Sequence, residues 1–157
     1  MHSNNQLIDQ FNRTKTTLRI SVTDQCNLRC KYCVVSSDIP FLKQENLLSF
    51  DEIDRLIKIF VNHGIDRIRI TGGEPLVRPG LLPFLKKIKQ AHPHVKLFMT
   101  TNGLLLEKYA QEIAKTGIST LNVSLDTTNP DKFKSITGAN RLETVLSGIK
   151  AIKKYSN

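Results

Sequence analysis

The sequence predicts an α/β fold in which about four βα units form a parallel sheet that curves into part of a (βα) barrel. Three observations support this fold class. Strand and helix patterns alternate along the chain, and the strands themselves alternate apolar with polar residues, so each has one polar face. Glycine-rich and polar segments follow the strands at their carboxyl ends, where (βα) barrels carry their active sites.

The length of 157 residues fits one domain, with residues 1–6 as a flexible tail and residues 7–157 as the partial barrel. The net charge is +9, from 23 Lys and Arg against 14 Asp and Glu. This charge suits a polyanionic ligand, but the sequence has no aromatic-interleaved basic stripe and no helix-turn-helix pattern, so nucleic acid is not expected as a partner. No apolar run has the length of a membrane helix or signal-peptide core, which predicts a cytoplasmic protein with no membrane partner.

The first strand leads directly into a loop that holds every cysteine of the chain. Apolar and polar residues alternate from residue 18 to residue 23, as in a half-buried strand. The cysteines follow with the spacing Cys26-x-x-x-Cys30-x-x-Cys33. Three thiolates so close in one loop can converge on one metal centre. A 4Fe–4S cluster held by three thiolates leaves one iron open to a small molecule.

Buried structural thiols, a disulfide and a zinc site are the alternatives to a cluster for these three cysteines. Asn27, Arg29 and Lys31 between them suit a loop rather than a core, which disfavours buried structural thiols. A disulfide leaves one cysteine over and suits an oxidising compartment for which the sequence has no signal. A zinc site completed by a histidine is the remaining alternative, although His63, the nearest one downstream, falls in a predicted helix.

The later elements alternate in type. A capping box at Ser49–Glu52 begins a helix that ends near Gly64. Further strands are predicted at 67–71, 95–101 and 120–125, and further helices at 79–91, 107–115, 130–136 and 141–154. Between the cysteine loop and the first helix, residues 36–48 are predicted to form a connector.

The polar positions of the strands gather on one face of the predicted sheet. They are Arg19, Ser21, Thr23, Arg69, Thr71, Thr100, Asn122, Ser124 and Asp126. Only the third strand blurs the pattern, because Lys96 and Phe98 share the face of Thr100. Since the apolar face must lie under the helices, the polar face is expected to line a lumen wide enough for ligands.

Three segments at or beyond the carboxyl ends of the strands complete the predicted rim, together with the cysteine loop: Gly72-Gly73-Glu74-Pro75, Thr101-Asn102-Gly103 and Ser124-Leu125-Asp126. Gly72 and Gly73 let a ligand approach the backbone closely. Their carbonyls and the Glu74 carboxylate can accept hydrogen bonds from an ammonium group. Ser124 can reach polar groups of the same ligand.

These motifs resemble those of the radical S-adenosylmethionine (SAM) enzymes, in which an aromatic residue, here Tyr32, precedes the last cysteine. The resemblance implies a 4Fe–4S cluster on Cys26, Cys30 and Cys33, whose open iron binds SAM. It also implies reductive cleavage of SAM to methionine and a 5′-deoxyadenosyl radical. The residues expected to bind SAM are Tyr32, Gly72, Gly73, Glu74 and Ser124.

The flanking residues narrow the resemblance to the GTP 3′,8-cyclase family of molybdenum cofactor biosynthesis. They are Asp9-x-Phe11-x-Arg13, residues 18–24, 69–76, 100–103 and 122–126. The resemblance implies a lyase that converts GTP to (8S)-3′,8-cyclo-7,8-dihydroguanosine 5′-triphosphate. It assigns Arg19, Arg69 and Thr100 to GTP. It also implies an electron donor such as flavodoxin or ferredoxin, and allows a homodimer.

The chain is short for that family, which has six βα units and a second 4Fe–4S cluster for which this sequence has no cysteines. We therefore expect an N-terminal portion that holds the first cluster but does not cyclise GTP alone. Three alternatives stay open at this point. They are a radical SAM enzyme acting on a peptide or another small molecule, a catalytically incomplete cluster-binding fragment, and a zinc-bearing nucleic-acid binder.

Overall fold

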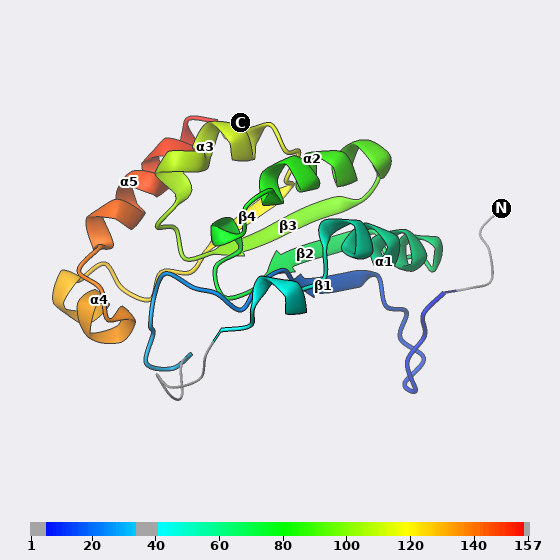
Figure 1. The fold of residues 1–157 in the computed structure, drawn as a ribbon, viewed down its shortest axis with the longest axis horizontal. Coiled ribbons are helices and arrows are strands. Elements are labelled where there is room, and N and C mark those ends of the chain that lie inside the picture. The colour runs from blue at the N-terminus through cyan, green and yellow to red at the C-terminus, as the bar shows by residue number, and fades with distance from the viewer. Residues whose placement is uncertain (1–5, 34–40, 156–157) are drawn as a thin grey trace.

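The computed structural model describes residues 6–33 and 41–155, which form a parallel β-sheet covered by helices (Figure 1). The sheet has four strands in the order β1-β2-β3-β4: β1 (Thr17–Ser21), β2 (Arg67–Thr71), β3 (Lys96–Thr101) and β4 (Thr120–Val123). Every neighbouring pair is parallel. This topology confirms the predicted α/β partial barrel. The predicted tail, residues 1–6, lies outside the described residues except for Gln6.

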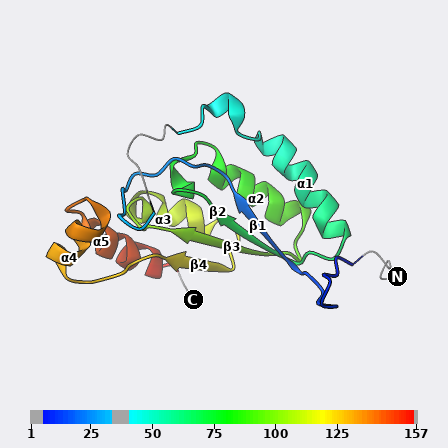
Figure 2. The same ribbon diagram turned by 90° about the horizontal axis from the view of Figure 1, so that it is seen from below.

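Each connection between successive strands contains an α-helix, and two further helices follow β4. The α-helices are α1 (Phe50–Asn62), α2 (Leu81–Ala91), α3 (Leu106–Ala114), α4 (Pro130–Thr137) and α5 (Leu142–Lys153). Helices α1 and α2 lie on one side of the sheet (Figure 2), and α3 packs against α5. All five match the predicted helices within two residues. Two short 3-10 helices, η1 (Gln44–Asn46) and η2 (Pro75–Val77), were not predicted; η1 lies within the expected connector.

Helix α1 begins as the sequence predicts. The Ser49 side chain accepts a hydrogen bond from Glu52 N–H (3.2 Å), and the Glu52 carboxylate accepts one from Ser49 N–H (2.7 Å). This reciprocal capping box satisfies backbone donors that the first turn cannot pair internally. The capping box thereby fixes the residue at which α1 begins, and α1 then covers the sheet.

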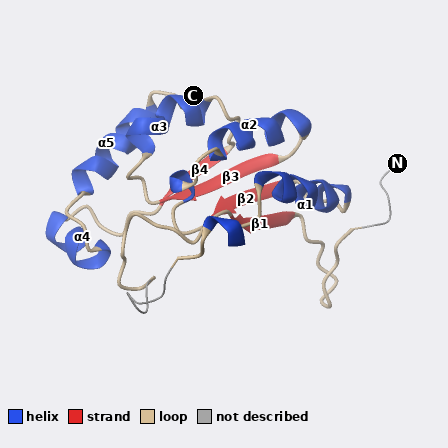
Figure 3. Ribbon diagram, viewed as in Figure 1, coloured by secondary structure: helices blue, strands red, loops and turns tan. Residues whose placement is uncertain are grey.

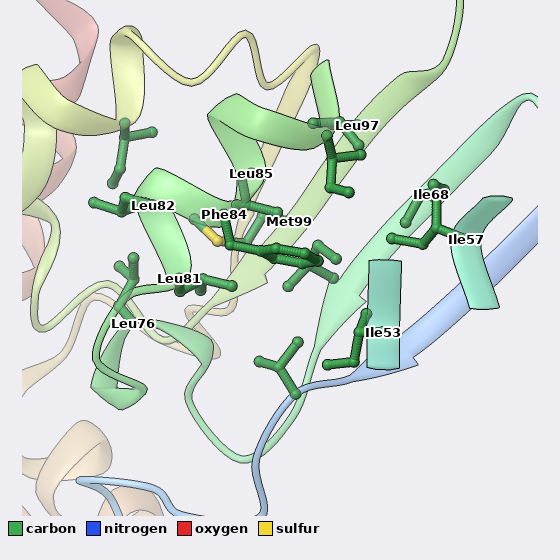
Figure 4. Packing of buried hydrophobic residues seen from close by; sticks show 14 of the residues in the cluster. Ile53, Ile57, Ile68, Leu76, Leu81, Leu82, Phe84, Leu85, Leu97 and Met99 are labelled. Carbon is green, nitrogen blue, oxygen red and sulfur yellow. The ribbon is translucent and has the colours of Figure 1, made fainter. Parts of the chain in front are cut away.

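The hydrophobic core lies between the helices and the apolar face of the sheet (Figure 4). Ile53 and Ile57 of α1 and Leu85 of α2 pack over Ile68 of β2 and Leu97 of β3, and each of these side chains is almost fully buried. Burial of one such side chain contributes about 1.5–3 kcal/mol relative to leaving it exposed. The apolar face is therefore the face that fixes the strand positions.

The opposite face of the sheet carries the polar residues, as predicted. Arg19 of β1 is exposed and is in register with Arg69 of β2, which in turn is in register with Phe98 of β3. The Arg69 guanidinium carbon lies 5.2 Å from the centroid of the Phe98 ring, a cation–π contact. Phe98, which blurred the polar pattern in the sequence, thus supports an arginine on this face.

Candidate functional site at the carboxyl ends of the strands

The cysteine loop lies beyond the carboxyl end of β1 and reaches toward α4 (Figure 3). Backbone hydrogen bonds join the two segments: Arg29 N–H donates to Thr137 C=O (3.2 Å) and Lys31 N–H to Ile136 C=O (2.9 Å). Leu28, in the middle of the loop, is buried in a small apolar cluster with residues that include Phe133 of α4. The buried Leu28 side chain, which lies between Cys26 and Cys30 in the sequence, therefore anchors the loop to the rest of the protein.

The glycine pair after β2 brings two backbone segments into direct contact. Gly73 N–H donates to Thr23 C=O (2.7 Å), and Glu74 N–H donates to Gln25 C=O (2.8 Å). A Cβ atom on Gly72 would lie 2.4 Å from Thr23 O, and one on Gly73 would lie 2.4 Å from Gln25 O. No side chain fits at either distance, so this approach to the cysteine loop requires glycine.

One cavity of about 330 Å³ joins the loop to the polar face of the sheet. Its lining comes from the carboxyl ends of all four strands and from the loops that follow β1, β2 and β3. The lining residues are Arg19, Cys26, Leu28, Cys30, Tyr32, Cys33, Thr71, Gly72, Gly73, Thr100, Thr101, Asn102 and Ser124. The structure thus brings nine of the predicted site residues together, and does not put Arg69 or Glu74 among the residues that line the cavity.

Ser124 is held at the rim by the neighbouring strand. Its backbone N–H donates to Thr101 C=O at 2.8 Å, which extends the pairing of β3 and β4 one residue beyond Val123. Ser124 therefore lies directly after β4, whereas the sequence predicts a strand that continues to residue 125.

Glu74 is fully buried, with none of its surface exposed, and its carboxylate is already hydrogen-bonded. Oε1 accepts from Leu76 N–H (3.1 Å) and from the Thr101 hydroxyl (2.8 Å), while Oε2 accepts from Asn102 N–H (2.7 Å). Burial raises the pKa of this carboxyl, although these three donors act in the opposite direction. The structure therefore places the Glu74 side chain against the end of β3, whereas the sequence suggested an acceptor for the ammonium group of a ligand.

Asn102 is a site residue that the sequence pattern indicates only as part of a turn. Its side-chain nitrogen lies 3.7 Å from Cys26 Sγ and 2.7 Å from Asn27 Oδ1, and its Oδ1 accepts from Leu104 N–H (3.1 Å). The only feature of the sequence that could have identified Asn102 as a site residue is its position directly after β3. An Asn-Gly pair is equally typical of an ordinary turn, so the pattern alone does not indicate which way the amide points.

Hydrogen bonding and burial set the protonation of the loop side chains. The Tyr32 hydroxyl donates to Asp126 Oδ2 at 2.8 Å, and this bond raises the pKa of Tyr32. Burial raises the pKa of the Cys30 thiol, and the neighbouring Cys26 and Cys33 act in the same direction. A metal centre that binds the Cys30 sulfur must therefore displace its thiol proton.

The three cysteines are the candidate ligands for a 4Fe–4S cluster. Within the described residues, no three His, Cys, Asp or Glu side chains form a group that could hold one metal ion. All three cysteines nevertheless line the same cavity. In a 4Fe–4S cluster each thiolate binds a different iron, so the sulfurs surround a volume and do not meet at a point. Cys26, Cys30 and Cys33, which all line one cavity, suit such a cluster.

Comparison with known proteins identifies the class of this chain. The family model described as the Radical SAM superfamily matches residues 20–157. The chain therefore belongs to the radical SAM superfamily, whose members combine a 4Fe–4S cluster with SAM. This membership agrees with the fold and with the positions of the three cysteines in the cavity.

The most similar relatives found among curated proteins carry one name. The chain is 45% identical over 145 residues to the GTP 3′,8-cyclase of Heliobacterium modesticaldum, covering 92% of this chain and 44% of that protein. It is also 45% identical over 146 residues to the GTP 3′,8-cyclase of Geobacter sulfurreducens, covering 93% of this chain and 45% of that protein. The chain thus spans slightly less than half the length of the curated relatives it matches.

Solved structures support the fold. Streptococcus suis SuiB bound to S-adenosylmethionine superposes with a TM-score of 0.72 at 20% identity, covering 90% of this chain and 32% of SuiB. Methylornithine synthase gives a TM-score of 0.69 at 13% identity, covering 98% of this chain and 44% of that one.

Among the described residues, no helix is both long and apolar enough to cross a membrane.

Proposed function

We propose that this chain is the cluster- and SAM-binding part of a GTP 3′,8-cyclase, which converts GTP to (8S)-3′,8-cyclo-7,8-dihydroguanosine 5′-triphosphate in molybdenum cofactor biosynthesis. The observation that carries the proposal is that Arg19 and Thr100 line the same cavity as the three cysteines. The 45% identity to proteins of that name supports it. The proposal includes a cytoplasmic location, flavodoxin or ferredoxin as the electron donor, and a homodimer as the assembly.

In this proposal Cys26, Cys30 and Cys33 hold the cluster. When bound, the cluster supplies the electron that splits SAM into methionine and a 5′-deoxyadenosyl radical. The backbone of Gly72 and Gly73, which is exposed and lines the cavity, accepts the methionine end of SAM through its carbonyls.

Ser124 and Tyr32, which line the same cavity, bind the remainder of SAM. The Tyr32 ring is held by its hydrogen bond to Asp126. We assign Glu74 a supporting role for the glycine pair, since its carboxylate is buried and already paired.

GTP occupies the polar face of the sheet next to SAM. A guanidinium group can bind phosphate oxygens through two parallel hydrogen bonds, and Arg19 is exposed and lines the cavity. Arg69 adds a second positive charge in register with Arg19, held over Phe98, and Thr100 offers a hydroxyl. These side chains suit the triphosphate and ribose of the nucleotide.

Arg19→Ala tests the GTP assignment. We expect this variant, reconstituted with iron and sulfide without oxygen, to bind GTP at least about tenfold more weakly, since a hydrogen bond to a charged group contributes about 1.5–3 kcal/mol. Arg55→Ala is the matched control, because Arg55 is exposed on α1, which covers the other face. Equal GTP affinity of Arg19→Ala and Arg55→Ala in equilibrium dialysis would remove Arg19 from the proposed site.

A further inference from the structure

Asn102 links the end of β3 to the first cluster ligand. Its side-chain nitrogen lies within hydrogen-bond distance of Cys26 Sγ (3.7 Å), and this sulfur also accepts from Leu28 N–H (3.4 Å). Two N–H donors therefore point at one sulfur, one from its own loop and one from the loop that follows β3. Neither the fold nor the family match assigns a role to this amide.

The hydrogen bonds around Asn102 determine which end of its amide faces the sulfur. Leu104 N–H can only donate, so the group that accepts from it at 3.1 Å is the amide oxygen. The NH₂ group must then face Asn27 Oδ1 and Cys26. The backbone N–H of Asn102 is held in turn by the buried Glu74 carboxylate at 2.7 Å.

We propose that Asn102 is a positioning residue that donates an N–H···S hydrogen bond to Cys26 and thereby raises the reduction potential of the cluster. The inference rests on the proposed cluster site, but not on GTP as the substrate. Reduction adds negative charge to the cluster and its thiolates. A fixed donor to a ligand sulfur stabilises that charge, and such hydrogen bonds are among the factors that set cluster potentials.

The test compares midpoint potentials of the reconstituted polypeptide with those of Asn102→Ala and Asn102→Asp. We expect both variants to be harder to reduce, by about tenfold in the reduction equilibrium, which is 59 mV for one electron. Asn102→Asp is expected to show the larger shift, because it puts a carboxylate oxygen near the sulfur. Asn129→Asp is the matched control: it adds the same charge at the N-cap of α4, where Asp caps as well as Asn.

A second measurement needs no variant and so covers the case in which the Asn102 variants lose the cluster. Wild-type protein labelled with ¹⁵N only in asparagine side chains, with its cluster reduced, is expected to show a weak ¹⁵N coupling in pulsed electron paramagnetic resonance. Unchanged potentials in both variants, or no such coupling, would overturn the inference and leave the proposed function standing. A wild-type chain that binds no cluster would overturn both.

Discussion

At the scale of single residues, Glu74 shows how one buried carboxylate organises the site without entering it. It lies after β2, as the N-cap of η2, and accepts three hydrogen bonds: from Leu76 of η2, from Thr101 at the end of β3 and from Asn102 directly after β3. One of these donors is the backbone of Asn102, whose side chain reaches Cys26. The Glu74 carboxylate thus acts on the cysteine loop through a neighbouring strand.

Glu74→Gln is predicted to lower the free energy of unfolding by about 1–3 kcal/mol, because an amide presents one acceptor oxygen and its NH₂ group then opposes a buried donor. Urea unfolding of the cluster-free protein at pH 7 measures this change. Glu107→Gln, at an exposed position on α3, is the control and should unfold like the wild type. Indistinguishable stability of the two variants would show that the buried hydrogen bonds are not needed.

The pH dependence follows from the pKa of Glu74, which burial raises above its ordinary value of 4.5. Just above pH 4.5 the folded protein keeps a proton on this carboxyl that the unfolded chain has released. Because the folded state then binds more protons, the contribution of Glu74 to the unfolding free energy falls as pH rises through this window. Glutamine does not titrate, so Glu74→Gln should remove this contribution from the dependence of the unfolding free energy on pH. An unchanged pH dependence would contradict the raised pKa of Glu74.

The site residues differ in how far the sequence could predict them. The three cysteines could be identified from their spacing, and Arg19 and Thr100 from strand alternation, because side chains two apart share a face. Glu74 and Asn102 follow the strands, where alternation no longer applies, so the direction of each side chain depends on tertiary contacts. The sequence therefore located their segments but not their partners.

At the scale of secondary-structure elements, the loops at the carboxyl ends of β1 and β2 are fastened together by the glycine pair. Gly73 N–H and Glu74 N–H donate to the backbone just before Cys26. The strands and helices were predictable because their periodicity and caps agree with the packing. The contact between the two loops was not predictable from the sequence. A Gly-Gly pair allows another backbone segment to come close, but it does not indicate which segment does so.

Gly73→Ala is predicted to reduce cluster binding severely, because its Cβ would lie 2.4 Å from Gln25 O and force the cysteine loop to move. The cost in unfolding free energy should be about 1–3 kcal/mol. Iron and sulfide analysis after anaerobic reconstitution, together with thermal unfolding, measures both effects.

Gly64→Ala is the matched control for that substitution. Its backbone has a positive φ of 91°, so alanine is strained there by about 1–3 kcal/mol, but its Cβ would meet only Gln6 at 3.6 Å. This control should lose stability and keep the cluster. Full cluster content in Gly73→Ala would contradict the fastening role of the glycine pair.

At the scale of the whole molecule, the sheet separates two functions. Its apolar face lies under α1 and α2 and supplies the core, while its polar face and carboxyl ends form the cavity with the cysteines. The net charge of +9 favours anionic ligands such as a nucleotide triphosphate. The chain spans slightly less than half the length of the relatives it matches, so we propose that cluster and SAM chemistry is the part of the reaction found here.

The most direct test of this account is SAM cleavage by the polypeptide reconstituted with iron and sulfide without oxygen and reduced with dithionite. The account predicts about four irons per chain for one 4Fe–4S cluster and the formation of 5′-deoxyadenosine, with both lost when Cys26, Cys30 and Cys33 are replaced by alanine. A colourless protein that binds only zinc, or a cluster-loaded protein that forms no 5′-deoxyadenosine, would contradict it.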